Sequence, residues 1–336
     1  MSRPPPDPIF TLRHHTGEVT SLSFVDVLSD YPHLLSGSTT GEVFLWNLKT
    51  YRVDDKLEAH EKKHILWVES LGNNIFTQGR DGLVNIWNYD DDEMENYNKQ
   101  SNIGTGRNRL NEFLGSIPAP TAGFCRCDIS KLKNLIAVPG EKAFQIDLYD
   151  LEKCSLVSTL IPESPDKYGM CICVKWLKPG NHILCGYENG KIILWDINQA
   201  AVLSELTCHK EPVFGLDFDD SVKWEGITCS AEEKLCVFSM KNFLSLVEKN
   251  CIVLPTTGAS SVAVRQDGKI VASGGWDGII RLFSWKTLKP LAYLNFHKSA
   301  INCLKFYDGK SENHAKLLAA GSKDKRITLW SIYRDK

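Results

Sequence analysis

The chain has 336 residues, of which 43% are hydrophobic and 24% are charged, and its formal net charge is −2. This composition supplies enough apolar material for a sizeable core, which excludes a chain that is disordered throughout. The near balance of 39 basic and 41 acidic residues excludes a general attraction to nucleic acid or to an anionic membrane.

The N-terminal segment MSRPPPDPIF is rich in proline and lacks the apolar core of a signal peptide. We expect residues 1–7 to form an extended lead-in and residues 8–14 to form a strand. Because no run of about 18 apolar residues follows, we expect no membrane span. These features predict a cytoplasmic and nuclear protein, in which the 11 cysteines are free thiols.

One phrase then returns seven times: an apolar strand, a turn with Gly, Asp or Asn, and an alternating strand that ends on an aromatic residue. Examples are LLSGSTTGEVFLWN, IFTQGRDGLVNIWN and VASGGWDGIIRLFS. The aromatic ends are Trp46, Trp87, Tyr149, Trp195, Phe238, Phe283 and Trp330. Their spacing is 41 to 47 residues, apart from one interval of 62.

A further strand precedes the phrase and is introduced in four copies by a histidine, at His15, His60, His209 and His297. About 43 residues per unit with four short strands is the signature of WD40 repeats. The chain resembles the WD40 family over nearly its whole length. That resemblance implies an all-β, seven-bladed propeller in a single domain, 1–336. Closure predicts that residues 8–14 form the outer strand of the last blade, beyond Trp330.

In the WD40 family a His, a Ser or Thr, an Asp and a Trp form a hydrogen-bonded structural tetrad within a blade. His60, Thr77, Asp81 and Trp87 match that tetrad in full. An enzyme needs one nucleophile and not several such sets, so we interpret the sets as structural and predict no catalytic residue.

The other copies match the tetrad only in part. In the first copy Thr40 stands at the Asp position, and in the last copy Ala320 stands at the hydroxyl position. The fifth copy offers Glu232 in place of Asp, and the sixth ends on Phe283 in place of Trp.

Two C-x-C pairs, Cys125/Cys127 and Cys171/Cys173, have the spacing of one strand face. We expect each pair to point to one face and pack in the core, since zinc sites use wider spacing with a second pair. The segment GTGRNR lacks the Lys-Ser/Thr ending of a P-loop. The sequence therefore predicts neither a metal site nor a cofactor.

The long interval contains an acidic, polar insertion at 88–112, which we place between blades 2 and 3. Its acidic run, Asp90 to Glu95, is followed by Arg107 and Arg109. Two interpretations stay open: a solvated loop, or a segment on which a partner docks.

Spacing from the histidines brings inner-strand residues to the mouth of the central channel. The candidate partner-binding residues are Glu18, Lys63, Arg126, Met170, Phe214 and Asn302. Thr20, Ile65, Pro212 and Ser260 are expected at the same level. Large apolar side chains exposed there would mark a contact site, and the alternative is that they pack against neighbouring loops.

Three segments carry a closer resemblance: PPPDPIFTLR, ASGGWDGIIRLFSWKTLKPLAYLNFH and LLAAGSKDKRITLWSIY. They look like the family of guanine nucleotide-binding protein subunit beta-like protein 1, whose fungal counterpart is called ASTRA-associated protein 1. The resemblance implies a non-catalytic scaffold that acts with the Triple-T co-chaperone and Hsp90 in the maturation and stability of phosphatidylinositol 3-kinase-related kinases. Its expected partners are co-chaperone subunits and kinase clients.

The same sequence bears on other classes of partner. Fungal members belong to a chromatin-linked assembly, so a propeller that reads a peptide or histone tail is the alternative. Proline occupies four of the first eight positions and no heptad precedes the first strand, so we expect no G-protein γ partner. Basic residues form no stripe with aromatics, so no direct nucleic-acid binding is expected. A closed propeller needs no self-association, which predicts a monomer.

Overall fold

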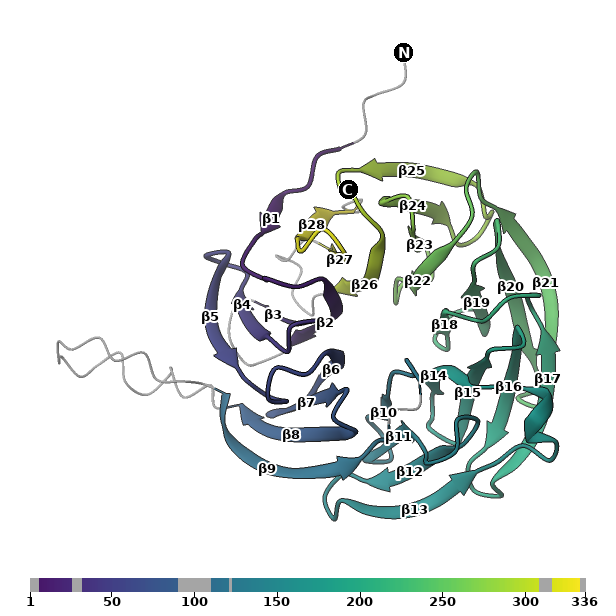
Figure 1. The fold of residues 1–336 in the computed structure, drawn as a ribbon. Coiled ribbons are helices and arrows are strands. Elements are labelled where there is room, and N and C mark those ends of the chain that lie inside the picture. The colour runs from purple at the N-terminus through teal and green to yellow at the C-terminus, as the bar shows by residue number, and fades with distance from the viewer. Residues whose placement is uncertain (1–5, 26–31, 90–109, 121–122, 308–315, 333–336) are drawn as a thin grey trace.

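The computed structural model describes residues 6–25, 32–89, 110–120, 123–307 and 316–332. In these ranges 28 strands form seven antiparallel sheets of four strands each. The sheets stand as blades around a central opening, with β2, β6, β10, β14, β18, β22 and β26 innermost (Figure 1). The predicted all-β, seven-bladed propeller is confirmed.

The strands follow the chain in regular order, and their bounds define the blades. Blade 1 contains β2 (Val19–Val25), β3 (His33–Ser38), β4 (Val43–Asn47) and β5 (Arg52–Leu57). Blade 2 contains β6 (Ile65–Leu71), β7 (Asn74–Gly79), β8 (Leu83–Tyr89) and β9 (Leu110–Pro118). Blade 3 contains β10 (Asp128–Ser130), β11 (Leu135–Pro139), β12 (Ile146–Asp150) and β13 (Ser155–Leu160). Blade 4 follows the short 3-10 helix η2 (Pro165–Lys167) and contains β14 (Cys171–Leu177), β15 (His182–Tyr187), β16 (Lys191–Asp196) and β17 (Ala201–Thr207).

The remaining three blades complete the ring. Blade 5 contains β18 (Gly215–Asp219), β19 (Glu225–Cys229), β20 (Lys234–Lys241) and β21 (Ser245–Val253). Blade 6 contains β22 (Ala259–Val264), β23 (Ile270–Gly275), β24 (Ile279–Ser284) and β25 (Pro290–Asn295). Blade 7 contains β26 (Ile301–Tyr307), β27 (Leu317–Ser322) and β28 (Ile327–Ser331), and its fourth strand is β1 (Phe10–Leu12).

The ring is closed by the N-terminal strand, as predicted. β1 runs antiparallel to β28, with Leu12 opposite Ile327, and lies on the outside of blade 7 (Figure 1). The Leu12 side chain is buried in the core between blades 7 and 1. Because the first and last parts of the chain share one sheet, the propeller has no free seam between them.

The hydrophobic core is divided into clusters that lie between neighbouring blades, one for each blade-to-blade junction. Inner strands are therefore covered on both faces, and β2 is buried along its whole length. The polar residues that alternate with apolar ones in β2 are therefore buried as well, and Ser21 Oγ accepts from the Val68 backbone N–H of blade 2 over 3.0 Å.

The prediction that each C-x-C pair points to one face is wrong. Between Cys171 and Cys173 the register of β14 on β15 shifts by a bulge. The bulge turns the two cysteine side chains to opposite faces of β14. Cys171 therefore packs between blades 3 and 4, and Cys173 packs between blades 4 and 5. Cys125 and Cys127, which precede β10, are divided between two cores in the same way.

The acidic insertion lies inside blade 2, which corrects its predicted place between blades 2 and 3. β8 pairs with β9, with Asn88 opposite Glu112 and Tyr89 opposite Leu110. Both ends of the 88–112 segment thus belong to strands of one hairpin, and residues 90–109 lie outside the described residues. The sequence concealed this because the strand after the insertion lacks the repeated phrase.

Two further properties follow from the described ranges. They contain no helix with the length and hydrophobicity needed to span a membrane. All 11 cysteines are free thiols, and nine of them are buried. Burial raises the pKa of the Cys127 and Cys303 thiols, which keeps them protonated and unreactive at neutral pH.

Candidate interaction surface at the channel mouth

Blade 2 joins its four tetrad residues by hydrogen bonds. His60 Nδ1 lies 2.8 Å from Asp81 Oδ2, and His60 Nε2 lies 2.9 Å from Thr77 Oγ1. Trp87 Nε1 donates to the same hydroxyl over 3.0 Å. The histidine is buried, so these hydrogen bonds satisfy polar groups that would otherwise have no partner inside the blade.

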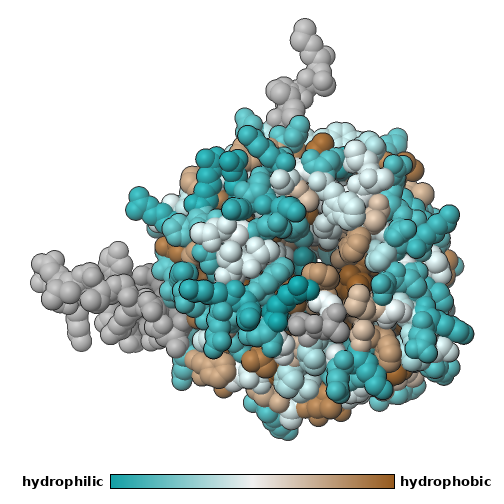
Figure 2. Space-filling view, in the orientation of Figure 1, coloured by the Kyte–Doolittle hydropathy of each residue, from teal (hydrophilic) through white to brown (hydrophobic). Residues whose placement is uncertain are grey.

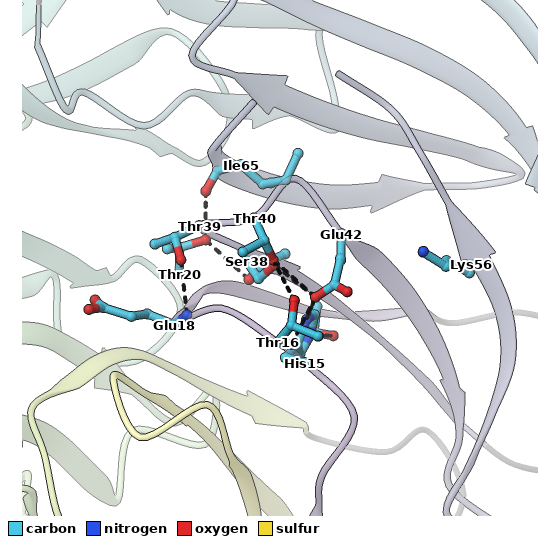
Figure 3. A network of polar contacts seen from close by, with 12 residues as sticks. His15, Thr16, Glu18, Thr20, Ser38, Thr39, Thr40, Glu42, Lys56 and Ile65 are labelled. Carbon is cyan, nitrogen blue, oxygen red and sulfur yellow. Dashed lines mark hydrogen bonds and ion pairs between the residues drawn. The ribbon is translucent and has the colours of Figure 1, made fainter. Parts of the chain in front are cut away.

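Blade 1 supplies its acid from a position that the sequence did not reveal. Glu42, two residues beyond Thr40, lies 3.5 Å from His15 Nδ1 and accepts from the Thr16 backbone N–H over 3.0 Å. Figure 3 shows this network, in which Thr40 Oγ1 also donates to Glu42. Burial lowers the pKa of His15 to about 4 in spite of the opposing effect of Glu42.

Blade 7 supplies its hydroxyl from the neighbouring strand. Ala320 of β27 faces Thr328 of β28 in the strand register, and Thr328 Oγ1 takes the hydroxyl role. It lies 2.8 Å from His297 Nε2 and accepts from Trp330 Nε1 over 2.8 Å. His297 Nδ1 lies 3.0 Å from Asp324 Oδ2, which completes the set.

Blades 5 and 6 vary the same arrangement. In blade 5, His209 lies 2.7 Å from Glu232 Oε2 and 2.9 Å from Thr228 Oγ1. In blade 6 a buried arginine replaces the histidine: Arg281 donates to both carboxylate oxygens of Asp277, at 3.1 and 2.6 Å. Because similar sets of a basic side chain and an acid, in most cases with a hydroxyl, recur inside several blades, we interpret them as residues that stabilise the fold.

One face of the ring carries the links between blades and the turns between the second and third strands of each blade; we call it the mouth face. In several blades the turn is tied to the link by a backbone hydrogen bond. Thr39, Arg80, Trp276 and Lys323 each donate their backbone N–H to a link carbonyl, at 2.8 to 3.0 Å. The side chain of this turn residue therefore has a fixed place around the opening.

Arg126 spans the channel. Its Nη2 donates to the backbone oxygens of Thr20 and Asn302, each over 3.1 Å, and so connects blade 3 to blades 1 and 7. Asn302 Nδ2 in turn donates to the Val19 oxygen over 3.0 Å. Asn302, predicted as a partner-binding residue, thus links the first and last blades, while Arg126 is half-buried at the mouth.

The other predicted mouth residues differ in exposure. Glu18, Met170 and Phe214 are half-buried, and Lys63 is exposed. Among the additional mouth positions, Ile65 is fully buried and Thr20 is buried, its hydroxyl donating to the Ile65 oxygen (Figure 3).

The mouth face contains three functional candidates that sequence reasoning missed: Arg80, Phe124 and Trp276. Trp276 is 44% exposed, donates from Nε1 to Ser260 Oγ over 2.8 Å, and lies 5.9 Å from the Phe214 ring. The sequence did contain a signal for two of them, because Arg80 and Trp276 each stand directly before the Asp-Gly of a turn between the second and third strands of a blade.

Below the mouth, the channel encloses a hollow of about 510 Å³ that is lined by the inner strands. Lys305 Nζ lies 2.9 Å from Glu69 Oε2, and Lys175 Nζ lies 2.8 Å from Asp217 Oδ1. Burial alone would raise the pKa of Glu69, but Lys305 and Lys131 outweigh it and lower that pKa to about 2. The Lys175–Asp217 pair joins the neighbouring blades 4 and 5, whereas the Lys305–Glu69 pair joins blades 7 and 2, on either side of blade 1.

The described residues contain no cluster of three or more His, Cys, Asp or Glu side chains arranged to hold a metal ion.

The seven blades, the tetrads inside them and the closing N-terminal strand define a seven-bladed propeller of the WD40 type.

Comparison with known proteins places the chain more narrowly. The family model of ASTRA-associated protein 1 matches residues 8–332, so the chain belongs to this family. It is 37% identical to guanine nucleotide-binding protein subunit beta-like protein 1 of Mus musculus, over 98% of this chain and 97% of the mouse protein. It is 25% identical to ASTRA-associated protein 1 of Schizosaccharomyces pombe (98% and 99% covered) and 28% identical to that of Verticillium alfalfae (98% and 93% covered). The resemblance inferred from the sequence is confirmed.

Proposed function

We propose that the protein is a non-catalytic scaffold of an ASTRA-type complex. In this role it acts with the Triple-T co-chaperone and Hsp90 in the maturation and stability of phosphatidylinositol 3-kinase-related kinases. Its partners are co-chaperone subunits and kinase clients, and it works as a monomeric propeller in the cytoplasm and nucleus. The observation that carries the proposal is the match of the ASTRA-associated protein 1 family to residues 8–332.

The geometry of the polar groups supports binding as the role of this fold. The histidine, hydroxyl and acid of blade 2 are bonded to one another and to Trp87, with His60 buried. A nucleophile needs access to substrate and a base free to accept its proton, and a hydroxyl that already accepts from an indole inside a blade has neither. The exposed features of the mouth face are instead suited to contact with another protein.

Affinity capture from cells tests the proposal. The tagged chain is expressed at its natural level, captured, and its companions are identified by mass spectrometry against a tag-only control. We expect co-chaperone subunits together with phosphatidylinositol 3-kinase-related kinases. Capture of a G-protein γ subunit, or of histones without any co-chaperone subunit, would contradict it.

The alternative function is a propeller that reads a peptide or histone tail in a chromatin-associated complex. The aromatic pair of Phe214 and Trp276 at the mouth favours a peptide ligand of some kind. The arginines at the same mouth disfavour a basic histone tail, because like charges across a contact repel. Direct titration of the purified chain with a histone H3 tail peptide distinguishes the two, and we expect no saturable binding.

A further inference from the structure

The mouth of the channel has an apolar side and a basic side. In Figure 2 hydrophobic colour gathers along the edge of the opening over β14 and β18, whereas hydrophilic colour covers the opposite edge over β2 and β6. Met170 precedes β14 and Phe214 precedes β18, and both are half-buried. The two sides thus present different chemistry to anything that lies across the opening.

The apolar side contains a tryptophan in a fixed orientation. Trp276 donates from Nε1 to Ser260 and lies against Gly258, where an added Cβ would come within 2.2 Å of the indole. Gly258 has a φ of +84°, in the left-handed region that favours glycine. The absence of a side chain there lets the indole lie on the backbone while 44% of its surface stays exposed. A held but exposed tryptophan loses little entropy on binding.

The basic side contains two arginines that are also held in place. The Arg80 guanidinium lies 4.5 Å from the centre of the Phe124 ring, a cation–π contact. Arg126 is anchored through Nη2 on two backbone oxygens. His64 lies close to both: burial is the main cause of its lowered pKa, and Arg80 and Arg126 lower it further.

These arginines have no carboxylate partner in the described part of the chain. The acids of the neighbouring turns are directed into the blades, where Asp81 bonds His60 and Asp324 bonds His297. Glu18 lies 3.5 Å from Lys323. Two ordered guanidinium groups at a concave mouth, without an internal anion, are suited to an anion supplied by a ligand.

We propose that the channel mouth binds an acidic peptide segment with an apolar anchor residue. Its carboxylates contact Arg80 and Arg126, and its anchor packs on Phe214 and Trp276 across the opening. The two arginines are held separately, one on Phe124 and one across the channel, which suits a run of carboxylates better than a single phosphate. The inference rests on the binding role proposed above and names the chemistry of the partner.

The test is a titration of the purified full chain with a fluorescein-labelled peptide in which a run of aspartates is followed by leucine and tryptophan. Fluorescence anisotropy is expected to show saturable binding that weakens as salt is added. Arg80→Glu should raise the Kd by about tenfold or more, the effect of losing one close charge pair at about 1.4 kcal/mol per decade. Trp276→Ala should raise the Kd by a similar factor.

A matched control makes the same charge change on the opposite face. Lys153 is exposed in the turn between β12 and β13, at the other end of its blade, and Lys153→Glu should leave the Kd unchanged. Because the Arg80 side chain is exposed, Arg80→Glu should unfold at the wild-type temperature. Trp276 also packs within the mouth, so the thermal unfolding of Trp276→Ala is measured alongside its Kd, which separates lost contacts from lost fold.

Several results would overturn the inference: no saturable binding of the acidic peptide, equal binding of a neutral or lysine-rich version, binding only when a phosphoserine replaces the aspartates, or equal losses in Arg80→Glu and Lys153→Glu. The failure of the proposed function is distinguishable, since it would appear as missing co-chaperone subunits in cells while the purified chain still binds the peptide.

Discussion

Thr328→Ala is the sharpest test of how blade 7 is stabilised. The substitution removes the hydroxyl that lies 2.8 Å from His297 and 2.8 Å from the Trp330 indole nitrogen. Both partners are buried and would lose this contact. Each buried polar group left without a partner costs about 1–3 kcal/mol, so we expect a loss of about 2–4 kcal/mol in the free energy of unfolding.

The strand register offers a rescue. In blades 1, 2 and 5 the hydroxyl is on the second strand, at the position that Ala320 occupies in blade 7, directly opposite Thr328. Adding Ala320→Thr to Thr328→Ala moves the hydroxyl back across the ladder and should restore most of the loss. The assay is equilibrium unfolding in urea, with Thr50→Ala in an exposed turn as the matched control. A loss no greater than that of Thr50→Ala, or no recovery in the double variant, would refute the reasoning.

Three further predictions concern other parts of the ring. Glu42→Ala should cost about 1–2 kcal/mol in urea unfolding because it removes the acceptor of three hydrogen bonds, from Thr16, Ser38 and Thr40, and Thr40→Ala should cost less; the reverse order would contradict the account. Since the pKa of Glu69 is lowered from 4.5 to about 2, its stabilisation is present above about pH 4.5 and lost as the pH falls toward 2. Lys305→Met should flatten that acid dependence of the urea midpoint, and an unchanged slope would exclude the pairing. Ellman's reagent should modify the exposed Cys251 first in native protein, whereas rapid reaction of the nine buried thiols would contradict their burial.

Periodicity predicted the fold because each blade repeats one local pattern. The interval between aromatic ends predicted the ring, and the alternation in residues 8–14 predicted the strand that pairs with β28. The tetrad of blade 2 could also be predicted from the sequence, because its four members keep the fixed spacing that the repeat has along the chain.

What the sequence missed depends on neighbours across strands or across the ring. Thr328 replaces the hydroxyl missing at Ala320 because the two face each other on adjacent strands, a relation that offsets along the chain do not express. Arg126 reaches the oxygens of Thr20 and Asn302, 106 and 176 residues away, because the ring closes. The bulge at Cys171 likewise breaks the alternation on which the C-x-C interpretation depended.

The central claim, that this propeller is a scaffold for kinase maturation, is tested most directly by acute depletion of the protein followed by quantitative proteomics. The account predicts that phosphatidylinositol 3-kinase-related kinases fall in abundance while their transcripts do not, and that re-expression of the wild-type chain restores them. Unchanged kinase levels after complete depletion would contradict it.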